Sequence, residues 1–286
     1  MKIINIIGGL GNQMFQYAFA LSLKNKTKEE VKIDISSFNG YELHNGYEIN
    51  KIFHKNLKIC SNKERKKISY NGKEFTQKLK RKIFKIEKNE YFEQDFSYNK
   101  NLNYTKKYFI GYWQSEKYFN EIKEEIKKKF KFPEIKDNKN MIILNKIKSN
   151  NSVSIHIRRG DYINHPIHGG ICDIAYYKKA IKYIKTNVKD PIMYIFSDDI
   201  KWCKENLYLS DANYINWNQG EDSFRDMQLM SECKHNIIAN SSFSWWGAWL
   251  NNNVNKIVIA PSKWFNDKNM DTKDLLPKEW RRIHVE

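Results

Sequence analysis

Short β-branched and aromatic runs alternate with helical patterns in the second half of the chain, from about Asn151 onward. Such alternation predicts βαβ units, in which a parallel sheet carries helices on both faces. The expected strands are 153–157, 192–196, 214–217, 236–239 and 256–260. The expected helices are 175–186, 199–206, 222–234 and 244–250. The predicted fold class is therefore α/β.

The first half shows the same pattern less regularly. A β-branched run at 2–7 ends at a glycine-rich turn, and apolar residues at helical spacing follow at 14–24. This order predicts a strand, a glycine turn and a helix. Further strands are expected at 31–35 and 107–113, and a charged amphipathic helix at 115–130.

A chain of 286 residues can form two modest domains, each with its own core. We place them at 1–145 and 146–286, joined near 139–151. Within the first, residues 62–88 hold eleven Lys and Arg against three Glu and interrupt the hydrophobic pattern. We expect this stretch to be a basic insert.

The formal net charge of +17 favours anionic partners, namely nucleic acid, membrane surfaces or phosphorylated ligands. A composition rich in Lys, Asn and Ile explains part of the excess equally well. The four cysteines have no Cys-x-x-Cys spacing, which is typical of reduced thiols. No stretch approaches the roughly 20 apolar residues that span a bilayer. We expect a cytoplasmic protein, with peripheral membrane contact through the basic insert as an open option.

Two arginines follow the strand expected at 153–157. Arg158 and Arg159 precede Gly160 and Asp161, so one guanidinium can face a ligand while the other turns back into the protein. The planar fork of an arginine suits phosphate oxygens. The pattern indicates a diphosphate clamp, and the alternative is an Arg–Asp pair that holds a loop.

Polar residues also follow two other expected strands. Asp198 can accept a hydrogen bond from a ribose or a base, or orient a neighbouring side chain, whereas Asp199 is expected to cap the next helix. Asn240, Ser241 and Ser242 bring hydroxyl and backbone N–H groups to a helix start, which is typical of a phosphate site. The tryptophans after them are expected to pack in the core and between the domains, with stacking on a sugar as the alternative.

The glycine turn near the N-terminus is a weaker signal. Gly9 and Gly11, with Asp34 further on, imitate a dinucleotide-binding fingerprint, but Met14 occupies the place of its third glycine. A Rossmann oxidoreductase is therefore one alternative. Asn12 and Gln13 are suited to a ligand rich in hydroxyl groups.

Several motifs are missing from the sequence. It has no Asp-x-Asp, no Walker loop, no His-x-x-x-His pair and no Gly-x-Ser-x-Gly elbow. We expect no metal and no cofactor, so arginine and N–H groups would have to neutralise a diphosphate.

Together, five segments resemble the bacterial alpha-1,2-fucosyltransferases of glycosyltransferase family 11. The matching segments are 8–16, 111–115, 156–161, 196–199 and 240–247, in the family's order. The resemblance implies a GT-B-like fold with two Rossmann-like domains facing a cleft. It also implies inverting transfer of L-fucose from GDP-β-L-fucose to the 2-hydroxyl of a galactose.

The resemblance also implies roles for single residues. On the donor side, in 146–286, Arg158 would grip the β-phosphate. Residues 1–145 would form much of the acceptor site. The resemblance does not identify the general base that removes the proton of the acceptor hydroxyl, and Asp161, in 146–286, is our candidate for it. The further donor candidates are His156, Asp198, Asp226, Asn240, Ser241, Ser242, Gly9 and Gly11, with His156 and Asp226 at the guanine and both serines at the diphosphate. The acceptor candidates are Asn12, Gln13 and Gln114.

Alternatives remain at this point. Another linkage or another GDP-sugar donor would leave a similar donor site. A basic nucleic-acid-binding protein is a further alternative, although acidic strand ends are unlike a nucleic-acid groove. The expected partners are GDP-fucose and a galactose-terminated oligosaccharide, for which a lipid-linked form is one option, and no nucleic acid.

Overall fold

A computed structural model describes residues 1–40, 43–53, 57–69 and 89–285. The chain forms two compact units: unit 1 is Met1–Lys131 with Asp271–Leu275, and unit 2 is Phe132–Met270 with Leu276–Glu286. Among the described strands, each unit has one sheet and all pairing is parallel, which confirms the α/β class. The first division falls between Lys131 and Phe132, earlier in the chain than the expected boundary at 145.

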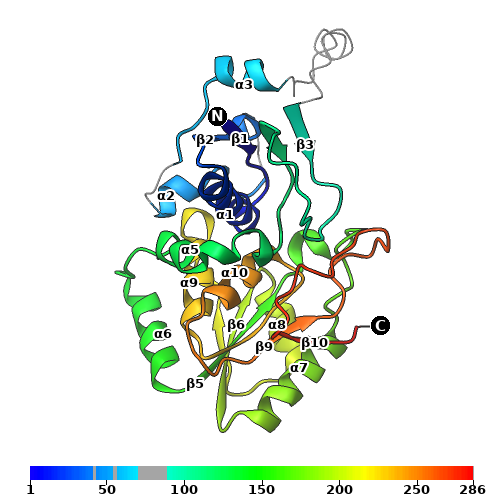
Figure 1. Ribbon diagram of the computed structural model, residues 1–286. Helices are drawn as coiled ribbons and strands as arrows, with labels where there is room; N and C mark the ends of the chain where they lie inside the picture. The colour runs from blue at the N-terminus through cyan, green and yellow to red at the C-terminus, as the bar shows by residue number, and fades with distance from the viewer. Residues whose placement is uncertain (41–42, 54–56, 70–88, 286) are drawn as a thin grey trace. The chain divides into compact units, whose positions relative to one another are not determined.

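Unit 1 is built around a four-stranded sheet in the order β2-β1-β4-β3. Helix α1 follows β1 along the chain (Figure 1). It buries most of its residues, including Met14, Phe15 and Ala18. The strands are β1 (Lys2–Asn5), β2 (Val31–Asp34), β3 (Glu90–Phe92) and β4 (Tyr108–Ile110). The helices are α1 (Leu10–Thr27), α2 (Ile49–Phe53), α3 (Asn62–Ile68) and α5 (Lys123–Lys129).

Two expectations for unit 1 were wrong in extent. The run 115–130 is not one helix, because Phe119 leaves the helical region at φ −131° while its ring is fully buried. Short 3₁₀ turns at Glu116–Tyr118 and Asn120–Ile122 therefore precede α5. The strand expected at 107–113 ends at Ile110, and the N–H groups of Tyr112 and Trp113 bond the Glu93 carboxylate instead of a neighbouring strand.

Unit 2 contains a six-stranded sheet in the order β10-β9-β8-β5-β6-β7. All strands and helices expected in 151–261 are present within a few residues. The strands are β5 (Asn151–Ile157), β6 (Pro191–Ser197), β7 (Asn213–Ile215), β8 (His235–Ile237), β9 (Val258–Pro261) and β10 (Arg281–Ile283). The helices are α6 (Asn138–Ser149), α7 (Ile174–Asn187), α8 (Ile200–Leu207), α9 (Phe224–Glu232) and α10 (Ser242–Leu250).

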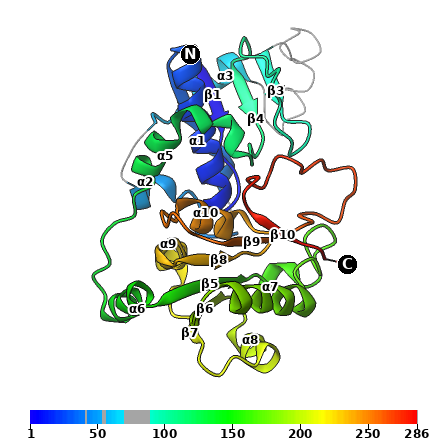
Figure 2. The same ribbon diagram turned by 60° about the horizontal axis from the view of Figure 1, so that its bottom comes forward.

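Helices cover both faces of this sheet, as expected. α7 and α8 lie on one face, and α6, α9 and α10 lie on the other (Figure 2). Right-handed crossovers give this division, because the chain runs from β5 outward to β7 and then returns to β8 on the far side of β5. α6 occupies most of the segment 139–151 that was expected to join the domains, and Asp137 caps its first turn.

The tryptophans of α10 pack in the core of unit 2, as predicted. Trp245 and Trp246 are fully buried and Trp249 is 3% exposed. Trp245 lies parallel to Trp249 at 6.0 Å between ring centroids and contacts Trp280 at 5.4 Å. They are therefore packing residues of unit 2.

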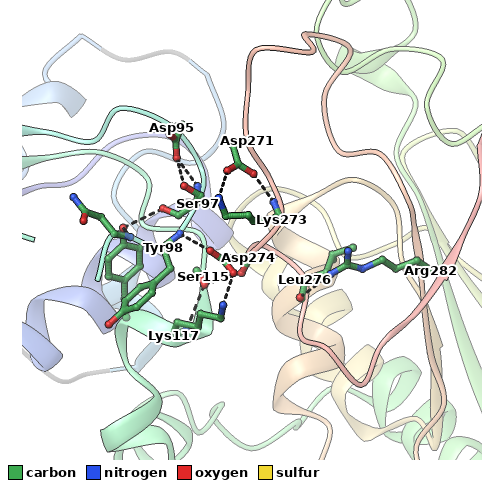
Figure 3. A network of polar contacts seen from close by, with 12 residues as sticks. Asp95, Ser97, Tyr98, Ser115, Lys117, Asp271, Lys273, Asp274, Leu276 and Arg282 are labelled. Carbon is green, nitrogen blue, oxygen red and sulfur yellow. Dashed lines mark hydrogen bonds and ion pairs between the residues drawn. The ribbon is translucent and has the colours of Figure 1, made fainter. Parts of the chain in front are cut away.

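A late segment of the chain, Asp271–Leu275, belongs to unit 1 (Figure 3). The Asp274 carboxylate accepts a hydrogen bond from the backbone N–H of Tyr98 at 3.0 Å and pairs with Lys117. Its backbone carbonyl accepts from the Ser115 hydroxyl at 2.7 Å. These contacts attach a segment that is distant in sequence to the loops around β4.

Two expectations concern membranes. Among the described helices, none is both long and apolar enough to cross a bilayer. Most of the basic insert at 62–88 lies outside the described residues, apart from α3 and Ser69.

Replacing Asp274 with Ala should lower the free energy of unfolding by about 1–3 kcal/mol, because the Tyr98 N–H loses its acceptor and Lys117 loses its partner. Urea unfolding of the purified variant measures this. Asp271→Ala is the matched control: Asp271 pairs with the exposed Lys273, so the loss should stay within about 0.5 kcal/mol. Equal losses in the two variants would contradict the role given to Asp274.

Candidate functional site

Three strand ends meet at the centre of the sheet in unit 2. β5 pairs in parallel with β6 on one side and β8 on the other, with Ile157 opposite Ser197 and Ile155 opposite Ile237. The chain leaves β5 toward β6 and later returns to β8, so the topological switch point lies between β5 and β8. Ligands of open α/β sheets bind outside the carboxyl ends of the strands at such a point.

Arg158 directly follows β5 and is held between two carboxylates. Its Nη2 lies 2.8 Å from Asp161 Oδ1, and its Nη1 lies 3.2 Å from Asp198 Oδ2. The guanidinium carbon is 5.7 Å from the centre of the Tyr162 ring. The side chain is 29% exposed, so a ligand can reach a cation that is already oriented.

Arg159 has a different environment. Its Nε lies 3.1 Å from Asp199 Oδ2, and its guanidinium stacks on the Trp202 ring at 4.1 Å. The two arginines therefore have different partners, but their side chains are about equally exposed, at 29% for Arg158 and 28% for Arg159. The alternative of an Arg–Asp pair also has support in the structure, because Asp161 pairs with Arg158 and Asp199 pairs with Arg159. Asp199 also caps α8, as predicted, by accepting from the Trp202 N–H at 3.0 Å.

His156 lies one residue before the end of β5 and is 6% exposed. Burial, with a smaller contribution from the Arg158 charge, lowers the pKa of His156 to about 3. The imidazole is therefore neutral at physiological pH. Its buried Nδ1 has no hydrogen-bond partner among the described residues. A neutral ring with such a nitrogen suits a base or a ribose hydroxyl.

The residues after β8 divide into two roles. The Asn240 amide donates to the carbonyls of His168 and Trp264, each at 3.1 Å, so this side chain holds neighbouring loops. Ser241 caps α10, its hydroxyl accepting from the Phe243 N–H at 3.3 Å. Ser242 begins the helix. The helix start thus places N–H groups and hydroxyls beside the β5–β8 switch point, an arrangement that binds anions.

Asp226 lies in the first turn of α9 and belongs to a polar network that the sequence pattern does not reveal. Asn218 donates to its Oδ1 at 2.7 Å, and Asn218 and Trp217 both donate to the Asn140 side chain. Burial raises the pKa of Asp226 to about 7, although the Asn218 hydrogen bond opposes this. A carboxylate in such a place gains from additional N–H donors of a ligand.

In unit 1, Asn12 and Gln114 lie together, because the Gln114 Nε2 donates to Asn12 Oδ1 at 2.7 Å. Gln13 is fully buried, and both atoms of its amide bond the backbone of neighbouring loops. It contributes by holding these loops. Gly9 precedes α1, and Gly11 is its second residue.

Asp34, the residue that imitates a ribose-binding acid, is fully engaged. It is 3% exposed, and its carboxylate accepts from the Tyr108 hydroxyl at 2.6 Å and the Ser36 N–H at 2.9 Å. Asp34, at the end of β2, therefore uses its carboxylate to bond Tyr108 of β4. Within the described part of the chain, no three His, Cys, Asp or Glu side chains are grouped so that they could hold a metal ion.

Two α/β units with parallel sheets, one with an arginine and a helix start at its switch point, define an α/β protein whose site suits an anionic ligand. More particularly, the chain belongs to glycosyl transferase family 11, whose model matches residues 1–284. This match confirms the family expected from the sequence and argues against the nucleic-acid-binding protein. It also argues against the oxidoreductase, whose ribose-binding acid would be Asp34, because the Asp34 carboxylate is already bonded to Tyr108.

Known proteins agree with this class. The chain is 38% identical over 295 residues to an alpha-1,2-colitosyltransferase of Escherichia coli, covering 98% of each protein. It is 25% identical over 260 residues to galactoside alpha-(1,2)-fucosyltransferase 2 of Rattus norvegicus, covering 87% of this chain and 67% of that protein. The solved structure of NodZ alpha-1,6-fucosyltransferase soaked with GDP-fucose aligns with a TM-score of 0.50 at 15% identity, covering 87% and 91% of the two chains. This last likeness shows a shared fold.

Replacing Asp226 with Asn should stabilise the protein at alkaline pH. Because the folded-state pKa of Asp226 is raised from 3.8 to about 7, the native state retains a proton that the unfolded chain releases, and stability falls as the pH rises between these values. Asparagine cannot ionise and avoids this loss. Melting curves at pH 5 and pH 8 should show a gain over wild type that is larger at pH 8, about 2–4 °C for each kcal/mol. If the melting temperature of the variant does not rise, or rises equally at the two pH values, the raised pKa of Asp226 is contradicted.

Proposed function

We propose that the chain transfers L-fucose from GDP-β-L-fucose to the 2-hydroxyl of a galactose residue, with inversion at the transferred carbon. The observation that carries this proposal is the oriented Arg158 beside the start of α10 at the switch point of unit 2. Membership in family 11 supports the sugar transfer, and the similarity to an alpha-1,2-colitosyltransferase and a galactoside alpha-(1,2)-fucosyltransferase supports the linkage.

For the donor, we propose that Arg158 and the N–H groups at Ser241 and Ser242 bind the diphosphate. His156 and Asp226 would then bind the guanine, with the Asp226 carboxylate accepting from N1–H and N2–H. Asp198 and Asn240 would act mainly by holding Arg158 and the loops around it, as their contacts indicate. In unit 1, we propose Gly9 and Gly11 as donor contacts. We propose Asn12 and Gln114, which are hydrogen-bonded to each other, as acceptor contacts. Gln13 supports this region by bonding the backbone of the glycine turn.

Inverting transfer needs two things from the protein. Negative charge grows on the departing diphosphate, and preformed donors such as a guanidinium and helix N–H groups stabilise it most in the transition state. The acceptor hydroxyl must also lose its proton. Asp161 was the candidate base expected from the sequence, but its ion pair with Arg158 favours a positioning role, so the base is sought elsewhere.

A second donor deserves a parallel test, because the colitosyltransferase matches over 98% of this chain. Colitose is fucose without the hydroxyl at carbon 3, so GDP-colitose presents the same guanine and diphosphate to the site. A site that hydrogen-bonds the missing hydroxyl discriminates strongly between the two sugars, whereas a site that leaves it in water does not.

The test is to incubate the purified protein with GDP-fucose or GDP-colitose and a panel of galactose-terminated disaccharides. Linkage analysis of the product identifies the sugar, the hydroxyl and the anomeric configuration. Product from GDP-colitose alone would replace the donor and keep the reaction class. No transfer from either donor to any galactoside would overturn the proposed function.

We also propose a cytoplasmic setting at the inner face of a bacterial membrane, with a lipid-linked glycan as acceptor. The basic composition of 62–88 supports this, because each well-placed basic residue contributes about 1 kcal/mol to binding an anionic surface.

Arg158→Ala should lower turnover by about two to three orders of magnitude, because the departing diphosphate loses an oriented donor. Arg158→Lys should not restore turnover, since lysine keeps the charge but not the planar fork. Arg159→Lys is the matched control and should be milder, because Arg159 lies against Trp202 and Asp199. Turnover of GDP-fucose by variants with unchanged melting curves measures this. Near-normal turnover in Arg158→Ala would move the diphosphate site elsewhere.

Transfer should persist in excess chelator, because we assign the diphosphate charge to Arg158 and the helix N–H groups. The measurement compares initial rates with EDTA, with added magnesium and with added manganese. Loss of most activity in EDTA that returns with either metal would show that an ion takes part of this charge.

A further inference from the structure

The carboxyl edge of the sheet in unit 1 carries its own group of polar side chains. β1 lies between β2 and β4, the turn of Gly8 and Gly9 follows β1, and Gln114 lies beyond β4. Gln114 is 6% exposed and donates to Asn12, while its buried Oε1 has no partner among the described residues. An amide oxygen in this state indicates a missing donor, such as a sugar hydroxyl.

Two residues near this edge have an unusual backbone conformation. Trp113 and His44 both have φ of 56°, in the left-handed region that bulky residues rarely adopt. The Glu93 carboxylate holds the turn before Gln114 by accepting from the N–H groups of Tyr112 at 2.6 Å and Trp113 at 3.0 Å. Such conformations persist only where the surroundings enforce them, and they cluster at functional sites.

The loop that carries His44 is fastened to α1 by Gln13. The Gln13 Nε2 donates to the carbonyls of Gly46 at 2.7 Å and Gly8 at 2.9 Å, and its Oε1 accepts from the Glu48 N–H at 2.9 Å. One buried side chain therefore fixes the His44 loop relative to the glycine turn.

The His44 imidazole lies across Gly9. A Cβ atom added at Gly9 would be 3.3 Å from both Cγ and Cδ2 of His44, and 3.5 Å from its Nε2. Gly9 has an ordinary extended backbone, with φ of −73°, so this position needs a glycine for the space that the ring uses and not for its conformation. The exposed His44 ring is thus placed at the turn that leads to Asn12.

We propose that His44 is the base that accepts the proton of the acceptor hydroxyl, in a subsite shared with Asn12 and Gln114. This inference rests on the proposed function. The hydroxyl oxygen forms a bond to the anomeric carbon of the donor sugar as the bond from that carbon to the β-phosphate breaks. GDP leaves with the electron pair, and the proton passes to the imidazole. Histidine is the side chain most often used for this step, because imidazole exchanges protons near neutral pH.

The first test is His44→Asn, because asparagine tolerates a left-handed backbone and removes only the imidazole. We expect kcat to fall by about 10²–10⁴-fold, with GDP affinity and the melting temperature unchanged. His284→Asn is the matched control, since His284 is an exposed histidine of unit 2, and it should keep wild-type turnover.

The second test separates proton transfer from support of the loop. His44→Gly also accepts the left-handed backbone, and added imidazole should restore part of its turnover in a concentration-dependent manner. Gly9→Ala should lower kcat by about tenfold, because its methyl group displaces the ring by a few tenths of an ångström.

Normal turnover in His44→Asn would overturn the inference. So would a His44→Gly variant whose turnover added imidazole does not restore. A change in either variant that is confined to the acceptor KM, with kcat unchanged, would overturn it as well. In each of these cases wild-type transfer stands, so the proposed function survives. If the wild-type protein transfers neither sugar, the proposed function and this inference fall together.

Discussion

The parallel pairing of β5 with both of its neighbours is the constraint from which the site in unit 2 follows. All seven residues of β5 are in register with β6, so the residues after these two strands start at the same level. Asp198 can therefore reach both the Arg159 N–H at 2.9 Å and the Arg158 guanidinium. A slip of one residue would exchange the faces of β5 and direct His156 to the opposite side of the sheet.

The charges around Arg158 also determine how an anion can enter. Two carboxylates share one guanidinium, so a diphosphate must compete with at least one of them. Asp198 is 27% exposed, and its other oxygen accepts the Arg159 N–H, whereas Asp161 is 51% exposed. Gly160 also packs closely against Asp198: an added Cβ would lie 2.9 Å from its Oδ2. Asp161 is therefore the carboxylate that can yield to a phosphate.

The sequence predicted features that depend on local pattern and failed where partners come from distant segments. Hydrophobic patterning located the strands and helices of 151–261, because buried strands form short apolar runs and the helices between them have helical spacing. The interpretation of Gln13 as a sugar contact overlooked Gly46, a partner 33 residues away that occupies its amide. The network of Asp226 likewise depends on Asn140, in a segment expected to be a linker. Polar side chains follow no period, so spacing alone cannot separate a ligand contact from a structural one.

Both units keep groups that are unfavourable for stability, in turns after strands in unit 1 and at a helix start in unit 2, and the surrounding structure compensates for them locally. In unit 1, Trp113 has a left-handed backbone, but its ring is fully buried and stacks on Phe19 at 3.9 Å. The Glu93 carboxyl that holds this turn is itself buried enough to raise its pKa to about 7. In unit 2, Asp226 is destabilised in its charged form and supported by Asn218. A fold selected for stability alone would replace these groups with apolar residues and relaxed turns. Their retention is expected where binding, and not folding, determines the residue, because such groups are held in place to contact a ligand.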